Sequence, residues 1–195
     1  MRDKLLELIK EKESHGGNYN ILAYDPPDKN RKLTKMTLKQ LVQYQRQKGD
    51  RAAGAYQLKP DTIRMLMRNM GLKNTDRFTP KLQEAMAQKL LDYRGYGAYE
   101  RGEMPAGEFG RNLAQEWASL PVVMSEDYKN PAGGDIRNLV EGMSYYQGEG
   151  TNKAKFTPEQ YLEYKNFLYG NDMSVPEMLN ETPAETQRLG MKWLD

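Results

Sequence analysis

Residues 12–20, KESHGGNYN, close the first predicted helix and contain the most informative carboxylate of this chain. Leu5, Leu6 and Ile9 form the apolar stripe of that helix. At about 100° per residue, Glu13 projects between the directions of Leu6 and Ile9, inside the stripe. A lysine there could lay its stem along the apolar surface and keep its ammonium group in water, but glutamate is shorter. The amphipathic pattern therefore does not explain Glu13.

The position of Glu13 in the helix suggests a chemical use. Glu13 lies in the last turn before Gly16 and Gly17, where the helix dipole places partial negative charge. Burial and the dipole would both raise the pKa of its carboxyl group. A general acid that works near neutral pH has to keep its proton in this way. The sequence predicts Glu13 as a general acid and leaves open the alternative of a solvent-facing glutamate at a frayed helix end.

The composition argues against several other classes of function. The chain has 195 residues, of which 38% are hydrophobic and 29% are charged, as in a globular protein. Its 29 basic and 27 acidic residues give a net charge of +2, so we expect no nucleic-acid partner. With no cysteine and His15 as its single histidine, the chain offers no thiolate zinc site and no catalytic histidine pair. We therefore expect carboxylate chemistry without a metal or an organic cofactor.

The N-terminal residues predict where the protein is made. Residues 1–12 alternate leucine with charged residues, so we expect no secretory signal peptide. No apolar run in the chain is long enough for a membrane span, so we expect no membrane insertion. The protein should stay in the cytoplasm unless it is released by lysis or carried out in a particle.

Helix-start signals recur along the chain and predict a mostly helical fold. Capping boxes stand at Thr37-Leu38-Lys39-Gln40 and Thr157-Pro158-Glu159-Gln160. Between the first two helices, residues 18–35 are rich in turn formers, which predicts a small hairpin or an irregular loop. Other predicted helices carry the stripes Ile63-Leu66-Met67-Met70, Leu82-Met86-Leu90 and Phe109-Leu113-Trp117, and one more begins at Thr182-Pro183.

The loops and the C-terminal composition predict how the chain is divided. Residues 130–134 and 147–150 are rich in turn-forming residues and are predicted to be flexible loops. From Asn171 onward, acidic residues outnumber basic ones. We expect one principal domain over residues 1–170 and a C-terminal appendage over residues 171–195.

Four segments in order carry a resemblance to a known family. They are residues 12–20 and the stretches Ala52-Ala53-Gly54-Ala55-Tyr56-Gln57-Leu58, Trp117-Ala118-Ser119-Leu120-Pro121 and Ser144-Tyr145-Tyr146-Gln147-Gly148. Together they resemble the lambda-endolysin type of phage lysozyme-like lytic transglycosylase. The resemblance implies a lysozyme-like α+β fold in which the catalytic glutamate, here Glu13, ends the first long helix. It also implies cleavage of the β-1,4 bond between N-acetylmuramic acid and N-acetylglucosamine in peptidoglycan.

The resemblance gives substrate-binding roles to residues near these motifs. Ser14 could hydrogen-bond the Glu13 carboxyl group or cap the end of the helix. Gly54 would let the backbone approach a sugar closely, or would be an ordinary turn glycine. Gln57 offers an amide to N-acetyl groups or hydroxyls. Residues expected only to border the cleft are His15, Asn152 and Lys153.

Aromatic side chains are a second kind of candidate for glycan contact. Tyr56, Tyr145 and Tyr146 could stack on sugar faces, although tyrosines at such spacing are as often half-buried core. We favour Tyr145 and Tyr146 over Tyr56 for contact with glycan. Trp117 continues an apolar stripe, so we expect it in the core.

The need for a second carboxylate separates two mechanisms. A glycoside hydrolase places a second carboxyl group about 5 to 9.5 Å from the first, and the candidates here are Asp25 and Asp50. The Glu-x8-Asp-x5-Thr spacing of the T4-lysozyme type is absent, since Leu22 stands nine residues after Glu13. This favours transglycosylation, in which the C6 hydroxyl of the muramic acid attacks and a 1,6-anhydro sugar forms.

Two alternatives stay open at this stage. One is a hydrolytic muramidase that uses Asp25 or Asp50, and the other is an inactive virion structural or glycan-binding protein. The expected partners are the glycan strands of peptidoglycan, with other virion proteins as further candidates. A phage enzyme of this kind would wait in the host cytoplasm or in the phage particle and act in the periplasm, as an endolysin or a virion-associated lysin.

Overall fold

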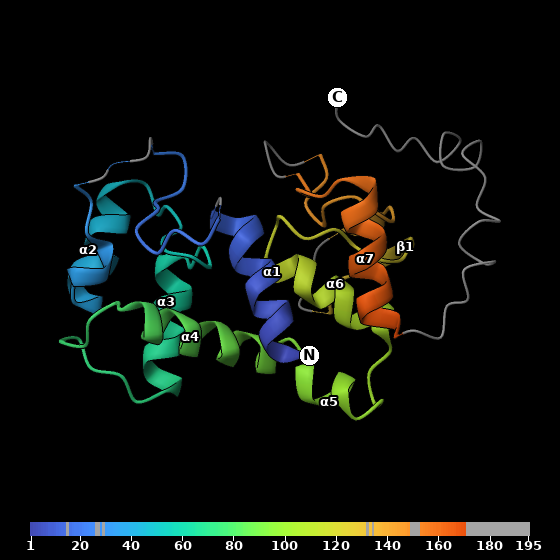
Figure 1. The fold of residues 1–195 in the computed structure, drawn as a ribbon, viewed down its shortest axis with the longest axis horizontal. Coiled ribbons are helices and arrows are strands. Elements are labelled where there is room, and N and C mark those ends of the chain that lie inside the picture. The colour runs from blue at the N-terminus through green and yellow to red at the C-terminus, as the bar shows by residue number, and fades with distance from the viewer. Residues whose placement is uncertain are drawn as a thin grey trace. The chain divides into compact units, whose positions relative to one another are not determined.

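The computed structural model describes residues 1–14, 16–25, 28, 30–131, 133, 135–148 and 153–170. The chain forms two compact units, of which the first ends at Tyr93 and the second begins at Arg94 (Figure 1). His15 and Asn152 lie outside the described residues. The proposed appendage over residues 171–195, with the helix predicted at Thr182-Pro183, also lies outside them.

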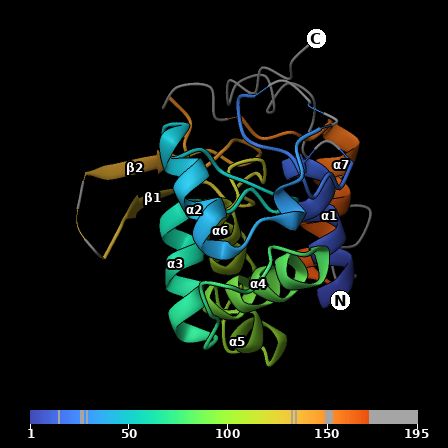
Figure 2. The same cartoon turned by 90° about the vertical axis from the view of Figure 1, so that its left-hand side faces the viewer.

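The first unit is built from helices and loops. Its elements are α1 (Arg2–Ser14), the short 3-10 helix η1 (Leu33–Lys35), α2 (Leu38–Gln47), α3 (Pro60–Asn69) and α4 (Pro80–Tyr93). Helices α2 and α3 pack side by side (Figure 2), and α1 contacts α4. The capping box predicted at the start of α2 is present, because Thr37 accepts from the backbone N–H of Gln40 while the Gln40 side chain accepts from Thr37. Local cap chemistry therefore fixes where this helix begins.

The stripe predicted for α1 is buried, whereas that of α4 needs a correction. Leu5, Leu6 and Ile9 are almost completely shielded from solvent. In α4, Leu82 is only half-buried and the neighbouring Gln83 is fully buried. Residues of α4 that share the buried face are Gln83, Met86, Ala87, Leu90 and Leu91. A polar side chain therefore occupies a core position of this helix and needs hydrogen-bond partners there.

The segment after α1 is an irregular loop that pairs with a later part of the chain. Leu22 forms an isolated antiparallel bridge with Ala53. The N–H of Ala23 donates to the carbonyl of Ala52 at 2.9 Å, and the N–H of Gly54 donates to the carbonyl of Ile21 at 2.9 Å. Of the two alternatives predicted for this segment, the loop is observed. Its pairing brings the sequence after Glu13 against the sequence that contains Gly54.

The second unit contains the short sheet of the described structure. Its elements are α5 (Tyr96–Glu100), α6 (Ala106–Glu116), β1 (Glu126–Lys129), β2 (Ile136–Leu139) and α7 (Pro158–Tyr169). β1 and β2 pair antiparallel, with Glu126 opposite Leu139 and Lys129 opposite Ile136 (Figure 2). Helices with a small antiparallel sheet confirm the α+β class. The hairpin lies at residues 126–139, not after the first helix, where a hairpin was one of the two alternatives.

The core of the second unit contains the predicted stripe of α6. Phe109 and Leu113 are fully buried and Trp117 is 2% exposed, so the prediction of a core tryptophan is confirmed. The ring of Tyr99 stacks on Phe109 with centroids 4.4 Å apart. At the start of α7, the capping box of Thr157 is present as predicted. In the part of the chain that the structure describes, no helix has the length and apolar character needed to cross a lipid bilayer.

Candidate active site

The candidate site begins at the C-terminal end of α1. Glu13 is half-buried in the last turn, between the buried residues Lys12 and Ser14. The Ser14 hydroxyl donates to the carbonyl of Lys10 at 2.6 Å, which supports the helix-capping alternative, and a bond from Ser14 to Glu13 stays a prediction. Gly16 follows with a φ of +90°, in the left-handed region that glycine adopts readily. The helix therefore stops one residue after Glu13 and turns sharply.

A tight turn at residues 53–58 packs against the loop that follows α1. Ala53 and Leu58 exchange backbone hydrogen bonds of 3.0 and 2.9 Å, and the N–H of Gln57 donates to the carbonyl of Gly54 at 3.1 Å. Gln57 has a φ of +49°, and its side-chain amide donates to the same Gly54 carbonyl at 2.9 Å. The half-buried Gln57 side chain is thus folded onto its own turn, and binding of an N-acetyl group by Gln57 stays a prediction.

Two fully buried glutamines hold this turn from α2 and α4. The Gln45 amide donates to the carbonyls of Arg51 at 2.9 Å and Leu58 at 2.7 Å. The Gln83 carbonyl oxygen accepts from the N–H of Ala55 at 2.9 Å. Buried amides that satisfy backbone groups in this way fix the loop conformation.

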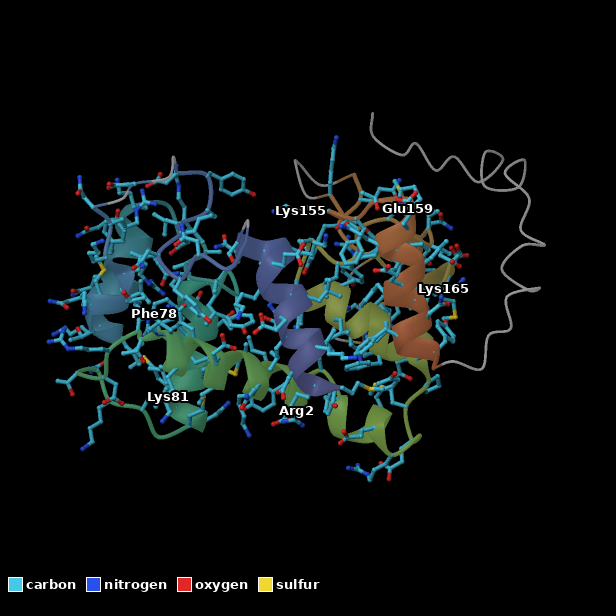
Figure 3. All side chains as sticks on the ribbon, viewed as in Figure 1. Arg2, Phe78, Lys81, Lys155, Glu159 and Lys165 are labelled. Atoms are coloured by element: carbon cyan, nitrogen blue, oxygen red, sulfur yellow. The ribbon has the colours of Figure 1, made fainter. Side chains whose placement is uncertain are left out.

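Gly54 is required by the packing of α4 against the turn. Its φ is +78°, and a Cβ built there would lie 2.8 Å from Phe78 Cε1 and 2.9 Å from Gln83 Cδ, with Gln83 Oε1 closer still. Phe78 is labelled just before α4 in Figure 3. The direction that a side chain would take at Gly54 is therefore filled by protein, which supports the turn-glycine alternative. A close approach of a sugar to this residue stays a prediction.

The carboxylate of Glu84, on α4, is the centre of a polar network beside α1. Its Oε1 atom accepts from the hydroxyl of Tyr19 and lies 3.4 Å from Nζ of Lys10. Its Oε2 atom accepts from the hydroxyl of Tyr56. Lys10 also pairs with Glu7 at 2.6 Å. One carboxylate thus joins α4 to α1, to the loop after α1 and to the 53–58 turn.

The pKa shifts of the groups in this network indicate which of them are charged at neutral pH. Burial alone raises the pKa of Glu84, but the hydrogen bonds from Tyr19 and Tyr56 and the charge of Lys10 lower it below its ordinary value. Burial lowers the pKa of Lys10, but its hydrogen bonds to Glu7 and Tyr19 and the charge of Glu84 raise it overall. Burial, and then the hydrogen bond to Glu84, raise the pKa of Tyr56. At neutral pH the network is a carboxylate, an ammonium group and neutral phenols.

Tyr56 supports the fold in this structure, whereas the role considered for it from the sequence was stacking on a sugar. Its side chain is 1% exposed, so its ring presents no face on which a sugar can stack. Its hydroxyl is used by Glu84. The sequence ranked Tyr56 behind Tyr145 and Tyr146 as a glycan contact, and that order stays a prediction.

The two candidates for a second carboxylate have unlike surroundings. Oδ2 of Asp25 lies 3.0 Å from the guanidinium of Arg31, and Oδ1 pairs with Arg51. Asp50 is exposed and has a φ of +56° at the turn after α2. Both oxygens of Asp25 are thus occupied by arginine, which makes this residue poorly suited to attack a sugar or to activate water.

Tyr145 and Tyr146 belong to the second unit. Tyr145 is 5% exposed and packs in a buried cluster with Ala114, Val122 and Leu139. The hydroxyl of the half-buried Tyr146 donates to the carbonyl of Gln115 at 2.6 Å. Their use as glycan contacts stays a prediction.

A cation covers this tyrosine pair from the hairpin. The guanidinium of Arg137 lies 5.0 Å from the ring centroid of Tyr145 and 5.9 Å from that of Tyr146. Lys153, the other candidate in this part of the chain, is exposed. Among the described residues, no three acidic or histidine side chains gather in a way that would hold a metal ion.

Sequence reasoning missed Gln45, Gln83 and Glu84. A signal was present for Gln83, because it precedes Met86 by three residues and so interrupts an apolar stripe. For Glu84 the sequence contains no comparable signal, because its partners lie 28, 65 and 74 residues away along the chain.

Comparison with known proteins identifies the family to which the chain belongs. The sequence model of a family described as Endolysin matches residues 12–152, which is more than half of the chain. The matched region starts at Lys12 and so includes Glu13. No curated protein and no solved structure matches the chain. The chain belongs to the Endolysin family and is thus a phage enzyme that degrades bacterial peptidoglycan.

Proposed function

We propose that this endolysin is a lysozyme-like lytic transglycosylase that cleaves the β-1,4 bond between N-acetylmuramic acid and N-acetylglucosamine, with Glu13 as general acid and base. The observation that carries this proposal is the place of Glu13: half-buried, in the last turn of α1, directly before a loop that is hydrogen-bonded into the fold. A carboxyl group fixed at a helix end suits proton transfer in both directions.

The proposed reaction needs one carboxyl group. Glu13 in its acid form gives its proton to the glycosidic oxygen as the bond from C1 of the muramic acid to that oxygen breaks. The resulting Glu13 carboxylate takes the proton of the muramic acid C6 hydroxyl, whose oxygen bonds to C1. The products are a 1,6-anhydro muramic acid end and a free hydroxyl on N-acetylglucosamine. Because the attacking hydroxyl is tethered within the substrate, no positioned water is required.

The surroundings of Asp25 favour this route over hydrolysis. Its two oxygens are paired with Arg31 and Arg51. Glu84 is a further carboxylate that was not singled out from the sequence. Both of its oxygens likewise accept hydrogen bonds, from Lys10 and from tyrosine hydroxyls. A hydrolytic muramidase would need a second carboxyl group that is free to activate water or attack the sugar, and Asp50 is the remaining candidate from the sequence.

Mass analysis of digested peptidoglycan tests the chemistry. We expect muropeptides one water lighter than those with a reducing end. The variants Asp25→Asn and Asp50→Asn should leave this product mass unchanged, whatever they do to the rate. Reducing-end products from the wild type, lost in either variant, would establish the hydrolytic alternative instead.

Several further assignments belong to this proposal. We assign residues 1–170 to the catalytic domain, and take peptidoglycan strands as the substrate that Ser14, Gly54, Gln57, Tyr145 and Tyr146 help to bind. The enzyme would reach the wall from the host cytoplasm at lysis, or from a phage particle through contacts with other virion proteins. An inactive structural or glycan-binding protein is the remaining alternative, and equal clearing of chloroform-treated Gram-negative cells by the wild type and Glu13→Gln would support it.

A further inference from the structure

We propose that Glu84 is a positioning residue for Glu13, which fixes the end of α1 by binding Lys10, Tyr19 and Tyr56 at once. This inference rests on the proposed function of Glu13.

Contacts of Lys10 connect Glu84 to the residues on either side of Glu13. Lys10 stands one helical turn before Glu13 on α1, and its ammonium group lies 3.4 Å from Glu84 Oε1. The carbonyl of the same Lys10 accepts the hydroxyl of Ser14, the residue that follows Glu13. Contacts of Lys10 therefore fix the helix on both sides of Glu13 along the chain.

The loop that leaves α1 is also held by this network. A Cβ at Gly17 would lie 3.7 Å from the stem of Lys10, so the loop passes directly over that side chain. Two residues later, the hydroxyl of Tyr19 donates to Glu84 and its carbonyl accepts from Gln83 at 3.2 Å. The side chains of adjacent residues on α4 thus hold both ends of Tyr19 and restrict the path of the chain after Glu13.

The network needs a carboxylate at position 84. The Glu84 side chain has two acceptor oxygens, and three groups donate to them: two phenol hydroxyls and one ammonium group. Glutamine would fit the same space but has one acceptor oxygen and no charge, so it cannot serve these three donors equally well. Because Lys10 and Glu84 are both partly shielded from solvent, loss of the carboxylate would leave an ammonium group with fewer partners.

A small shift of Glu13 should have a large effect on the rate of catalysis. Misplacement of a reacting group by about 1 Å can cost about 10²-fold in rate. A loosened network would move Glu13 without removing it, so we expect Glu84→Gln to lower kcat by about 10-fold or more, with KM changed by less than about twofold. Tyr19→Phe and Tyr56→Phe each remove one donor and should lower kcat by smaller factors.

The experiment compares these variants with Thr37→Ala, which weakens the cap of α2, where the Thr37 side chain is hydrogen-bonded to Gln40. Soluble glycan strands serve as the substrate, and the folded fraction is measured by circular dichroism under assay conditions. The pH at which kcat falls by half on the alkaline side reports the Glu13 proton. We expect that pH to move in Glu84→Gln and to stay at the wild-type value in Thr37→Ala.

Each outcome decides one claim. A fall in kcat and a shifted pH profile in Glu84→Gln, with neither in Thr37→Ala, support the positioning role. Kinetics of Glu84→Gln that match those of Thr37→Ala at equal folded fraction would overturn it. If Glu84→Gln does not fold, the two phenylalanine variants decide in the same way. Full activity of Glu13→Gln would instead refute the proposed function itself, so the two failures are distinguishable.

Discussion

The substitution Gly54→Ala tests how tightly the 53–58 turn is packed against α4. Two costs add up at this position. The φ of +78° is unfavourable for alanine by about 1–2 kcal/mol. The new methyl group would also overlap Gln83 and push its amide away from the N–H of Ala55, and an unsatisfied buried donor costs about 1–3 kcal/mol. The free energy of unfolding should therefore fall by about 2–5 kcal/mol, a large part of the stability of a typical protein.

Gly71→Ala is a matched control for this prediction. Gly71 has a φ of +66°, and a Cβ there would meet no atom within 4 Å. It should therefore show the conformational cost alone, about 1–2 kcal/mol. Urea unfolding followed by far-UV circular dichroism measures both variants. Equal losses in the two variants would refute the argument that the approach of Gln83 and Phe78 requires glycine at position 54.

Three further predictions concern hydrogen bonds elsewhere in the fold. Gln45→Ala removes the side-chain donor of the Arg51 carbonyl, whereas the Leu58 carbonyl keeps the N–H of Ala53, so the free energy of unfolding should fall by about 1–3 kcal/mol in urea titrations. Thr157→Ala removes the cap of α7 and should cost about 1 kcal/mol in the same assay; an unchanged midpoint would contradict the role of the cap. Because the pKa of Glu84 is lowered in the folded state, its contribution to stability is present above the unfolded pKa and is lost as pH falls through the folded value. Unfolding measured between about pH 7 and pH 3 should therefore show a smaller acid-induced loss in Glu84→Gln than in the wild type, and parallel curves would contradict this.

Helix boundaries could be predicted where the deciding chemistry is local. The capping boxes at Thr37 and Thr157 join residues three positions apart, so the sequence contains both partners side by side. The buried stripe of α1 follows in the same way from the spacing of Leu5, Leu6 and Ile9. Glu13 was selected because it interrupts that spacing, and the structure places it half-buried in the last turn.

The hairpin could not be predicted from local pattern. Its strands are four residues long each and mostly polar, and only Leu139 among them is buried. Strands of this kind are held by backbone pairing rather than by an alternating apolar face, so they leave little signal in the sequence. The turn-forming residues between them suggested a loop and gave no register.

The network around the candidate site could not be predicted from the sequence either, but for a different reason. Tyr56 has the residue type of a sugar-stacking platform, and only its burial and its bond to Glu84 show that it supports the fold. Arg51 in the same way comes to Asp25 from 26 residues away. Side chains brought together over such separations have no local pattern from which to infer them.

The rate at which anhydro-muropeptides are released from purified peptidoglycan tests the central claim most directly. Glu13→Gln should lower that rate by about 10²-fold or more, because its amide cannot transfer a proton, while binding to the insoluble wall is retained. Glu11→Gln, two residues earlier on the exposed side of α1, should stay close to the wild-type rate. A Glu13→Gln enzyme that releases product as fast as Glu11→Gln would contradict the assignment of the catalytic acid.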